Sequence, residues 1–80
     1  MFYLLIGDHG LLQSEGEFKT FQELKQYLVD NTENIFGWIL DQDDNTLELP
    51  DFTIASDLQD IQYILDFYDF SWWTVYADFR

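Results

Sequence analysis

Two segments of the chain open with a helix-start motif, so the fold must accommodate two amphipathic helices. In residues 20–23 and 56–59 a hydroxyl side chain stands three positions before Glu or Gln, which is the pattern of a capping box. The first helix is expected from Phe21 to Asp30 and the second over residues 58–68. Their apolar stripes consist of Phe21, Leu24 and Leu28 in the first helix and of Leu58, Ile61, Ile64, Leu65 and Tyr68 in the second.

Four further runs are short, apolar and bounded by turn residues, as β-strands are: residues 2–6, 35–40, 46–49 and 72–79. Residues 41–45, Asp-Gln-Asp-Asp-Asn, suit a turn and predict a hairpin between the second and third runs. The last run alternates, with Trp73, Val75, Ala77 and Phe79 on one side and Trp72, Thr74, Tyr76 and Asp78 on the other.

The resulting order is β-α-β-β-α-β, so the fold class expected is α+β. This order predicts a single domain over residues 1–80 with a ferredoxin-like, four-stranded antiparallel sheet and two helices on one face. Leu11 and Leu12 leave an alternative open, in which residues 2–14 form an N-terminal hairpin within a different α+β sheet.

Size and composition favour a small intracellular protein that folds. Aromatic residues make up 20% of the chain, far more than in acidic chains that stay disordered. Cysteine is absent, which excludes a disulfide scaffold and thiolate metal sites. No apolar run is long enough to span a bilayer, and the N-terminal run lacks the basic flank of a signal peptide. We expect a soluble, cytoplasmic protein.

The acids are the most unusual feature of the sequence. Sixteen Asp and Glu oppose three Lys and Arg, for a formal net charge of −13, and residues 26–78 hold twelve of the acids and no Lys or Arg. This charge excludes direct binding to nucleic acids and attraction to anionic membranes. It favours a basic protein as partner, because a field of one sign steers association with the opposite one.

The candidate partner-binding residues are acids on the expected helices and hairpin, together with aromatic residues away from the expected core stripes. Carboxylates one helix turn or two strand residues apart approximate the spacing of DNA phosphates, about 7 Å along a strand. Aromatic anchors inside a polar rim commonly carry binding energy. The candidates are Asp41, Asp43, Asp44, Glu48, Asp51, Asp57, Asp60, Tyr63, Asp66, Phe67, Asp69, Trp72 and Tyr76.

Enzyme chemistry finds little support in the sequence. Residues 41–52 begin like a calcium loop, but Thr46 stands where the loop needs Gly and Phe52 where it needs Glu. His9 is the only imidazole and is interpreted as a turn residue, with Ser14 as the nearest hydroxyl. A chain this short leaves little room for a cleft of about 300 Å³. We therefore expect no enzyme activity, no cofactor and no metal.

In its small size, its lack of cysteine and its acidic, aromatic-rich composition, the chain resembles the anti-CRISPR and antirestriction inhibitors of bacteriophages and mobile elements. The resemblance rests on overall character and on no motif. It implies a non-enzymatic inhibitor in the host cytoplasm, a monomer or small homo-oligomer, that mimics DNA phosphates in the basic cleft of a defence nuclease or CRISPR effector. Two alternatives are an immunity protein or antitoxin that neutralises a basic nuclease toxin, and a structural or assembly subunit.

Overall fold

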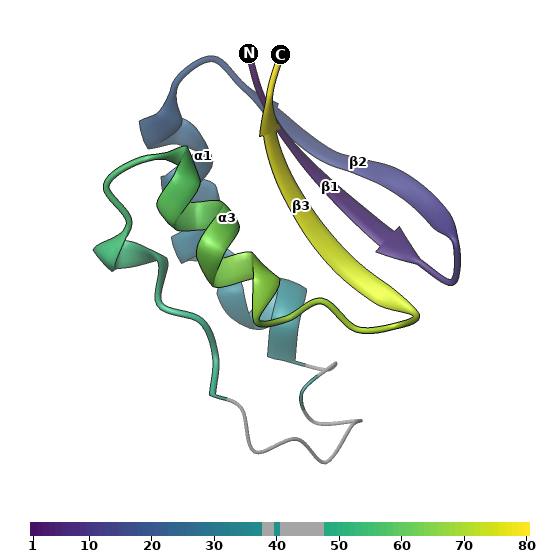
Figure 1. The fold of residues 1–80 in the computed structure, drawn as a ribbon. Helices are drawn as coiled ribbons and strands as arrows, with labels where there is room; N and C mark the ends of the chain where they lie inside the picture. The colour runs from purple at the N-terminus through teal and green to yellow at the C-terminus, as the bar shows by residue number, and fades with distance from the viewer. Residues whose placement is uncertain (38–39, 41–47) are drawn as a thin grey trace.

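The computed structural model describes residues 1–37, 40 and 48–80, and shows a twisted three-stranded sheet with helices on one face (Figure 1). The strands are β1 (Phe2–Asp8), β2 (Leu11–Phe18) and β3 (Trp73–Phe79). They are antiparallel in the order β2-β1-β3. Strand β1 is therefore central and pairs with β3, which is far from it in sequence, and the two ends of the chain lie side by side.

The N-terminal hairpin, the alternative left open by the sequence, is confirmed and runs further than expected, to Phe18. Its loop has two residues, His9 and Gly10, with φ of 52° and 86°. Two positive φ values in succession match the right-handed twist of the flanking strands. The register shifts between Leu4 and Leu5, where β2 carries one extra residue opposite β1, so this edge strand is bulged.

The two helices expected from the sequence both begin where a side chain caps them. Helix α1 spans Phe21–Asp30, as expected, with Thr20 accepting from the Glu23 amide and Glu23 accepting from the Lys19 amide. Helix α3 spans Leu58–Asp66 and ends two residues before the expected Tyr68. Its capping residue is Asp57 rather than the expected Ser56.

The four-stranded, ferredoxin-like sheet is wrong, because within the described residues the sheet has three strands. The expected strand over residues 35–40 overlaps a π-helical turn, η1 (Glu33–Gly37), which buries Ile35 and Phe36. Periodicity cannot separate a short buried strand from a short buried helix. Of the other expected strand, residues 46–49, Glu48 and Leu49 are described and lie outside any strand. The expected turn at 41–45 lies outside the described residues.

The core fills the space between the helices and the inner face of the sheet. Phe36 is completely buried near its centre, with ring centroids 5.9 Å from Phe52, 5.3 Å from Tyr68 and 5.6 Å from Trp73. Trp73 lies on the face of β3 that the alternation assigned to the core, together with Val75 and Ala77, which are also buried. Phe79, expected on the same side, is exposed at the end of the strand.

The helices leave the opposite face of the sheet uncovered by described residues (Figure 1). Alternation and register place Leu5, Leu12 and Tyr76 on that face. Leu12 is 61% exposed and Tyr76 is 50% exposed. A bare sheet face with large apolar side chains is a feature that monomeric domains usually cover or use for binding.

Candidate functional site

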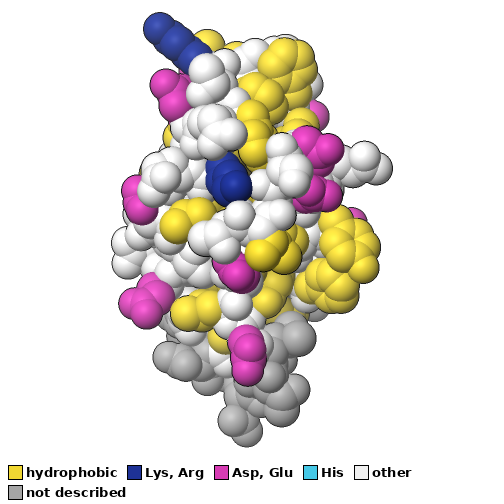
Figure 2. Space-filling model, turned by 90° about the vertical axis from the view of Figure 1, so that its left-hand side faces the viewer, with side chains coloured by type: hydrophobic (Ala, Val, Ile, Leu, Met, Phe, Trp, Pro, Cys, Tyr) yellow, Lys and Arg dark blue, Asp and Glu magenta, His cyan; other side chains and the backbone are white. Residues whose placement is uncertain are grey.

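Every acid that the structure describes is exposed or half-buried, and no charged side chain in the described part of the chain is buried. Figure 2 shows the helical side of the molecule, where acidic side chains are scattered among apolar and neutral ones rather than gathered in one patch. A basic side chain lies in the middle of the same view. The stretch without bases in the sequence is therefore not free of bases in space: Lys25 Nζ donates to the Ala55 carbonyl at 2.8 Å.

Three of the candidate acids are occupied by capping their own chain. Asp57 accepts from the Asp60 amide at 2.9 Å, and Asp60 accepts from the Ser56 amide at 2.9 Å, so the two carboxylates form the capping box of α3. Asp51 caps the 3-10 turn η2 (Phe52–Ile54). The Thr53 hydroxyl and then the Thr53 amide, both donating to Asp51, lower the pKa of this carboxyl. These acids have a structural role.

The acids at the other end of α3 have no such role. Asp66 is the last residue of the helix and Asp69 follows three positions later, and neither carboxylate has a hydrogen-bonding partner among the described residues. The negative end of the helix dipole disfavours an anion at Asp66 by roughly 0.3–1 kcal/mol. An unpaired carboxylate at an unfavourable position is a better candidate for partner binding than a capping one.

The aromatic candidates lie on two surfaces. Tyr63 on α3 and Phe67, which directly follows the helix, are 66% and 58% exposed, and their rings meet edge to face at 5.2 Å. Tyr76 lies on the uncovered face of β3. Trp72 precedes β3 and packs its ring on His9, with the centroids 5.1 Å apart. His9 is confirmed as a turn residue, and its Nδ1 lies 2.5 Å from the Asp8 carboxylate.

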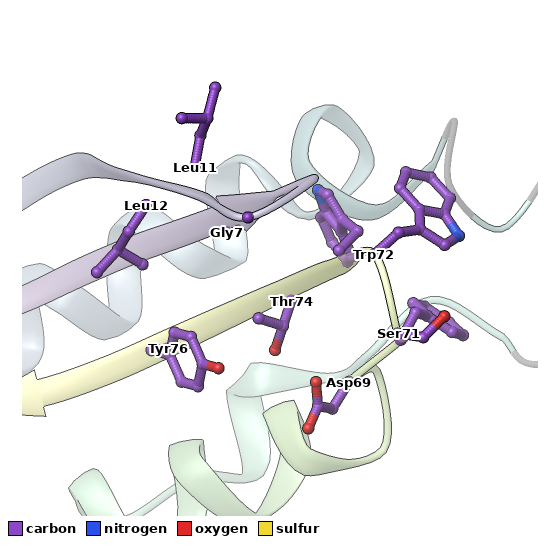
Figure 3. Close-up of a pocket in the computed structure, with 11 residues that line it drawn as sticks. Gly7, Leu11, Leu12, Asp69, Ser71, Trp72, Thr74 and Tyr76 are labelled. Atoms are coloured by element: carbon purple, nitrogen blue, oxygen red, sulfur yellow. The ribbon is translucent and has the colours of Figure 1, made fainter.

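Two adjoining hollows connect the aromatic residues Trp72 and Tyr76 to the carboxylates of Asp66 and Asp69. A hollow of about 390 Å³ lies over Gly7 and is lined by Asp69, Trp72 and Tyr76, among others (Figure 3). A second hollow, of about 280 Å³, lies between α3 and the outer edge of β3 and is lined by Asp66 and Tyr76. Tyr76 lines both, so we name Asp66, Asp69, Trp72 and Tyr76 the β3-edge surface.

The expectation that the chain has little room for a cleft of about 300 Å³ is wrong, because the larger hollow exceeds that volume. It lies over β1 and β3 on the face of the sheet that no described helix covers. Among the described residues, the titratable side chains that line it are Asp69 and Tyr76. One carboxylate and one phenol give the hollow a weakly acidic, hydrogen-bonding character.

The remaining candidates lie elsewhere. Glu48 is exposed, and its backbone carbonyl accepts from the Tyr68 hydroxyl; burial and then the Glu48 charge raise the pKa of Tyr68. Asp41, Asp43 and Asp44 lie outside the described residues. Within the described part of the chain, no group of three or more His, Asp or Glu side chains is placed to hold a metal ion. No helix in that part is long and apolar enough to cross a membrane.

Sequence reasoning missed the residues that shape the larger hollow, above all Gly7, Leu12 and Thr74. The strand expected at residues 2–6 stops before Gly7, whereas β1 continues through Gly7 to Asp8. The available signal was an isolated Gly next to a strand-like run, which can mark a close approach to a strand.

Comparison with known proteins gives no relative: no family model, no curated protein and no solved structure matches the chain.

Proposed function

We propose that the protein is a non-enzymatic inhibitor that binds a basic nucleic-acid-binding protein through the β3-edge surface and occupies its DNA-binding cleft. One observation carries the proposal. Two carboxylates without partners among the described residues, Asp66 and Asp69, flank two partly exposed rings around the adjoining hollows at one sheet edge. Aromatic anchors surrounded by charged groups are the usual composition of a binding site for another protein.

Electrostatics supports a basic partner. The net charge of −13 creates a field that attracts cations over a distance of about 10 Å at moderate salt. Within that field, Asp66 and Asp69 are the acids of the β3-edge surface that are not engaged in capping. Distant acids would increase the association rate, while these two would make the contacts that determine how long the complex lasts.

The β3-edge surface would compete with DNA because it would bind in the partner's phosphate-binding cleft. A cleft that binds phosphates presents Lys and Arg at close spacing, and carboxylates placed there displace the nucleic acid by occupying the same cations. The target class we propose is a host defence nuclease or CRISPR effector, reached in the host cytoplasm. The capping acids Asp57 and Asp60 contribute to the field but make local hydrogen bonds within the protein.

The Tyr63–Phe67 pair favours a second candidate, an immunity protein that neutralises a basic nuclease toxin. Two exposed rings in contact at the end of α3 form a compact apolar anchor, which suits a protein surface better than a phosphate-binding cleft. If Tyr63→Ala with Phe67→Ala abolished target binding while changes at the β3-edge surface did not, the second candidate would replace the first.

The proposed function is tested by capture followed by competition. The immobilised protein is exposed to host lysate at about 50 and 200 mM salt, and each captured protein is purified and titrated with labelled DNA in the presence of the inhibitor. We expect a basic target whose DNA affinity falls as the inhibitor is added, and whose capture weakens steeply at the higher salt. A target that binds tightly at both salt concentrations and keeps its DNA affinity would contradict the proposal.

A further inference from the structure

The larger hollow on the uncovered face of the sheet has two chemically different sides. Leu11 and Leu12 from β2 lie on one side of β1, and Thr74, Tyr76 and Asp69 lie on the other (Figure 3). The first side offers apolar side chains. The second offers two hydroxyls and a carboxylate.

Gly7 keeps the hollow open between these two sides. A Cβ built at this position would lie 3.3 Å from Thr74 Cγ2 and 4.0 Å from Leu12 Cδ1. Any side chain on Gly7 would therefore occupy the space between the leucines and the polar groups. The missing side chain creates a floor of bare backbone, which allows a ligand to approach closely.

The charge of the hollow selects the kind of ligand. Among the described residues that line it, Asp69 is the one charged residue, and none of them is Lys or Arg. The Asp69 carboxylate has no partner among the described residues, so its hydrogen-bonding capacity is free for a ligand. An anionic ligand would be repelled both by Asp69 and by the net charge of −13. The residues therefore favour a cation.

Shape and chemistry together favour a cation with an apolar stem. The stem of an arginine or lysine side chain packs well against aliphatic groups while its charged head reaches a polar group. A guanidinium has five donors in a planar fork, which can serve a carboxylate and hydroxyls at once, and it stacks on aromatic rings. Asp69, Thr74 and Tyr76 supply such acceptors, and Tyr76 also supplies a ring.

The geometry points to this hollow as a binding site for an arginine side chain presented by the basic partner protein. The guanidinium bonds the Asp69 carboxylate on the polar side, and the aliphatic stem lies across Gly7 against Leu12. This inference rests on the proposed function, because it identifies which group of the partner enters the surface.

The test uses a short peptide rather than the partner, so that it can fail independently of the proposed function. A glycine-flanked arginine peptide is titrated into the isotope-labelled protein and followed by NMR. The matched probe is the same peptide with citrulline, which keeps the shape of arginine without its charge. We expect the arginine peptide to shift the amides of Gly7 and Thr74 and the indole N–H of Trp72. Equal shifts from the citrulline peptide would overturn the inference.

Two single variants separate local binding from general charge. Asp69→Asn and Glu33→Gln change the net charge equally, and both side chains are exposed and without hydrogen-bonding partners among the described residues, but Asp69 lines the larger hollow, whereas Glu33 lies on η1 and lines neither hollow. We expect Asp69→Asn to weaken binding of the arginine peptide about tenfold and Glu33→Gln to change it by less than about twofold. Equal weakening by both variants would overturn the site. If the peptide experiment failed while DNA competition held, the proposed function would stand and the hollow would not be a site for arginine.

Discussion

At the scale of single residues, the role of a carboxylate on α3 depends on its position along the helix. Asp57 and Asp60 begin α3 and accept backbone amides, whereas Asp66 ends it without a partner among the described residues. The sequence named all three as partner-binding residues because composition does not distinguish them. Asp is as common as Ser at the capping position of a helix. A capping motif that allows Asp there assigns Asp57 and Asp60 correctly to the start of α3.

The capping role of Asp57 can be measured directly. We expect Asp57→Ala to lower the free energy of unfolding by about 1 kcal/mol, because the Asp60 amide loses its acceptor. Asp57→Asn keeps an acceptor oxygen and should unfold at nearly the wild-type urea concentration. If the Asn variant were as unstable as the Ala variant, the charge of Asp57 rather than its hydrogen bond would be what stabilises the helix.

The turn residue His9 provides a second test. Its φ of 52° is in the left-handed region, which Asn adopts easily and β-branched residues adopt at a cost of about 1–2 kcal/mol. We expect His9→Val to be destabilised by that amount and His9→Asn to be at least as stable as the wild type, both by urea denaturation. Equal stability of the Val and Asn variants would mean that the hairpin loop does not adopt this conformation.

At the scale of elements, the sequence was most informative where a motif acts locally. The capping residues Thr20 and Glu23 and the apolar spacing after them predicted both ends of α1. The alternating pattern of β3 predicted its buried and exposed sides, apart from Phe79. Both patterns depend on neighbours in sequence, so no knowledge of the fold was needed.

The elements that failed are those whose form depends on tertiary contacts. Ile35 and Phe36 look like the start of a buried strand, but they belong to a π-helical turn that places the Phe36 ring against Phe52, Tyr68 and Trp73. Likewise, Asp66, Asp69, Trp72 and Tyr76 were all named from the sequence. Their meeting around two hollows required β3 to be an edge strand with one uncovered face.

The π-helical turn is expected to be an essential part of the core. Phe36→Ala should lower the free energy of unfolding by about 3–5 kcal/mol, because it leaves a cavity in the centre of an aromatic cluster. Phe67→Ala removes the same side chain from the exposed residue that follows α3, and should change stability by no more than about 0.5 kcal/mol. Similar losses in the two variants, measured by thermal and urea unfolding, would contradict the described core.

At the scale of the whole molecule, the charge of −13 that would attract the proposed basic partner also opposes folding. Like charges held on a compact surface repel each other. Basic side chains offset this repulsion only locally, because Lys25 is bound to the Ala55 carbonyl and Arg80 pairs with Asp78. Capping hydrogen bonds secure the helices despite this repulsion. Dissolved salt would screen these charges and so reduce the repulsion.

Screening is therefore expected to raise the melting temperature. Between about 20 and 500 mM NaCl the Debye length falls several-fold, and we expect the melting temperature to rise by about 4–8 °C, the shift that 1 kcal/mol produces in a domain of this size. KCl at the same ionic strength should act equally if screening is the cause. A melting temperature that stayed constant or fell would show that self-repulsion does not limit the stability of the protein.

The most direct test of the central claim compares two double variants of equal charge in the DNA-competition assay with the captured target. Asp66→Asn with Asp69→Asn removes both acids of the β3-edge surface, whereas Glu17→Gln with Glu33→Gln removes two exposed acids on β2 and η1. We expect the first variant to lose at least about tenfold in its ability to displace DNA, and the second to stay within about threefold of the wild type. Equal losses in both variants would mean that net charge alone inhibits, and that the β3-edge surface is not the binding site.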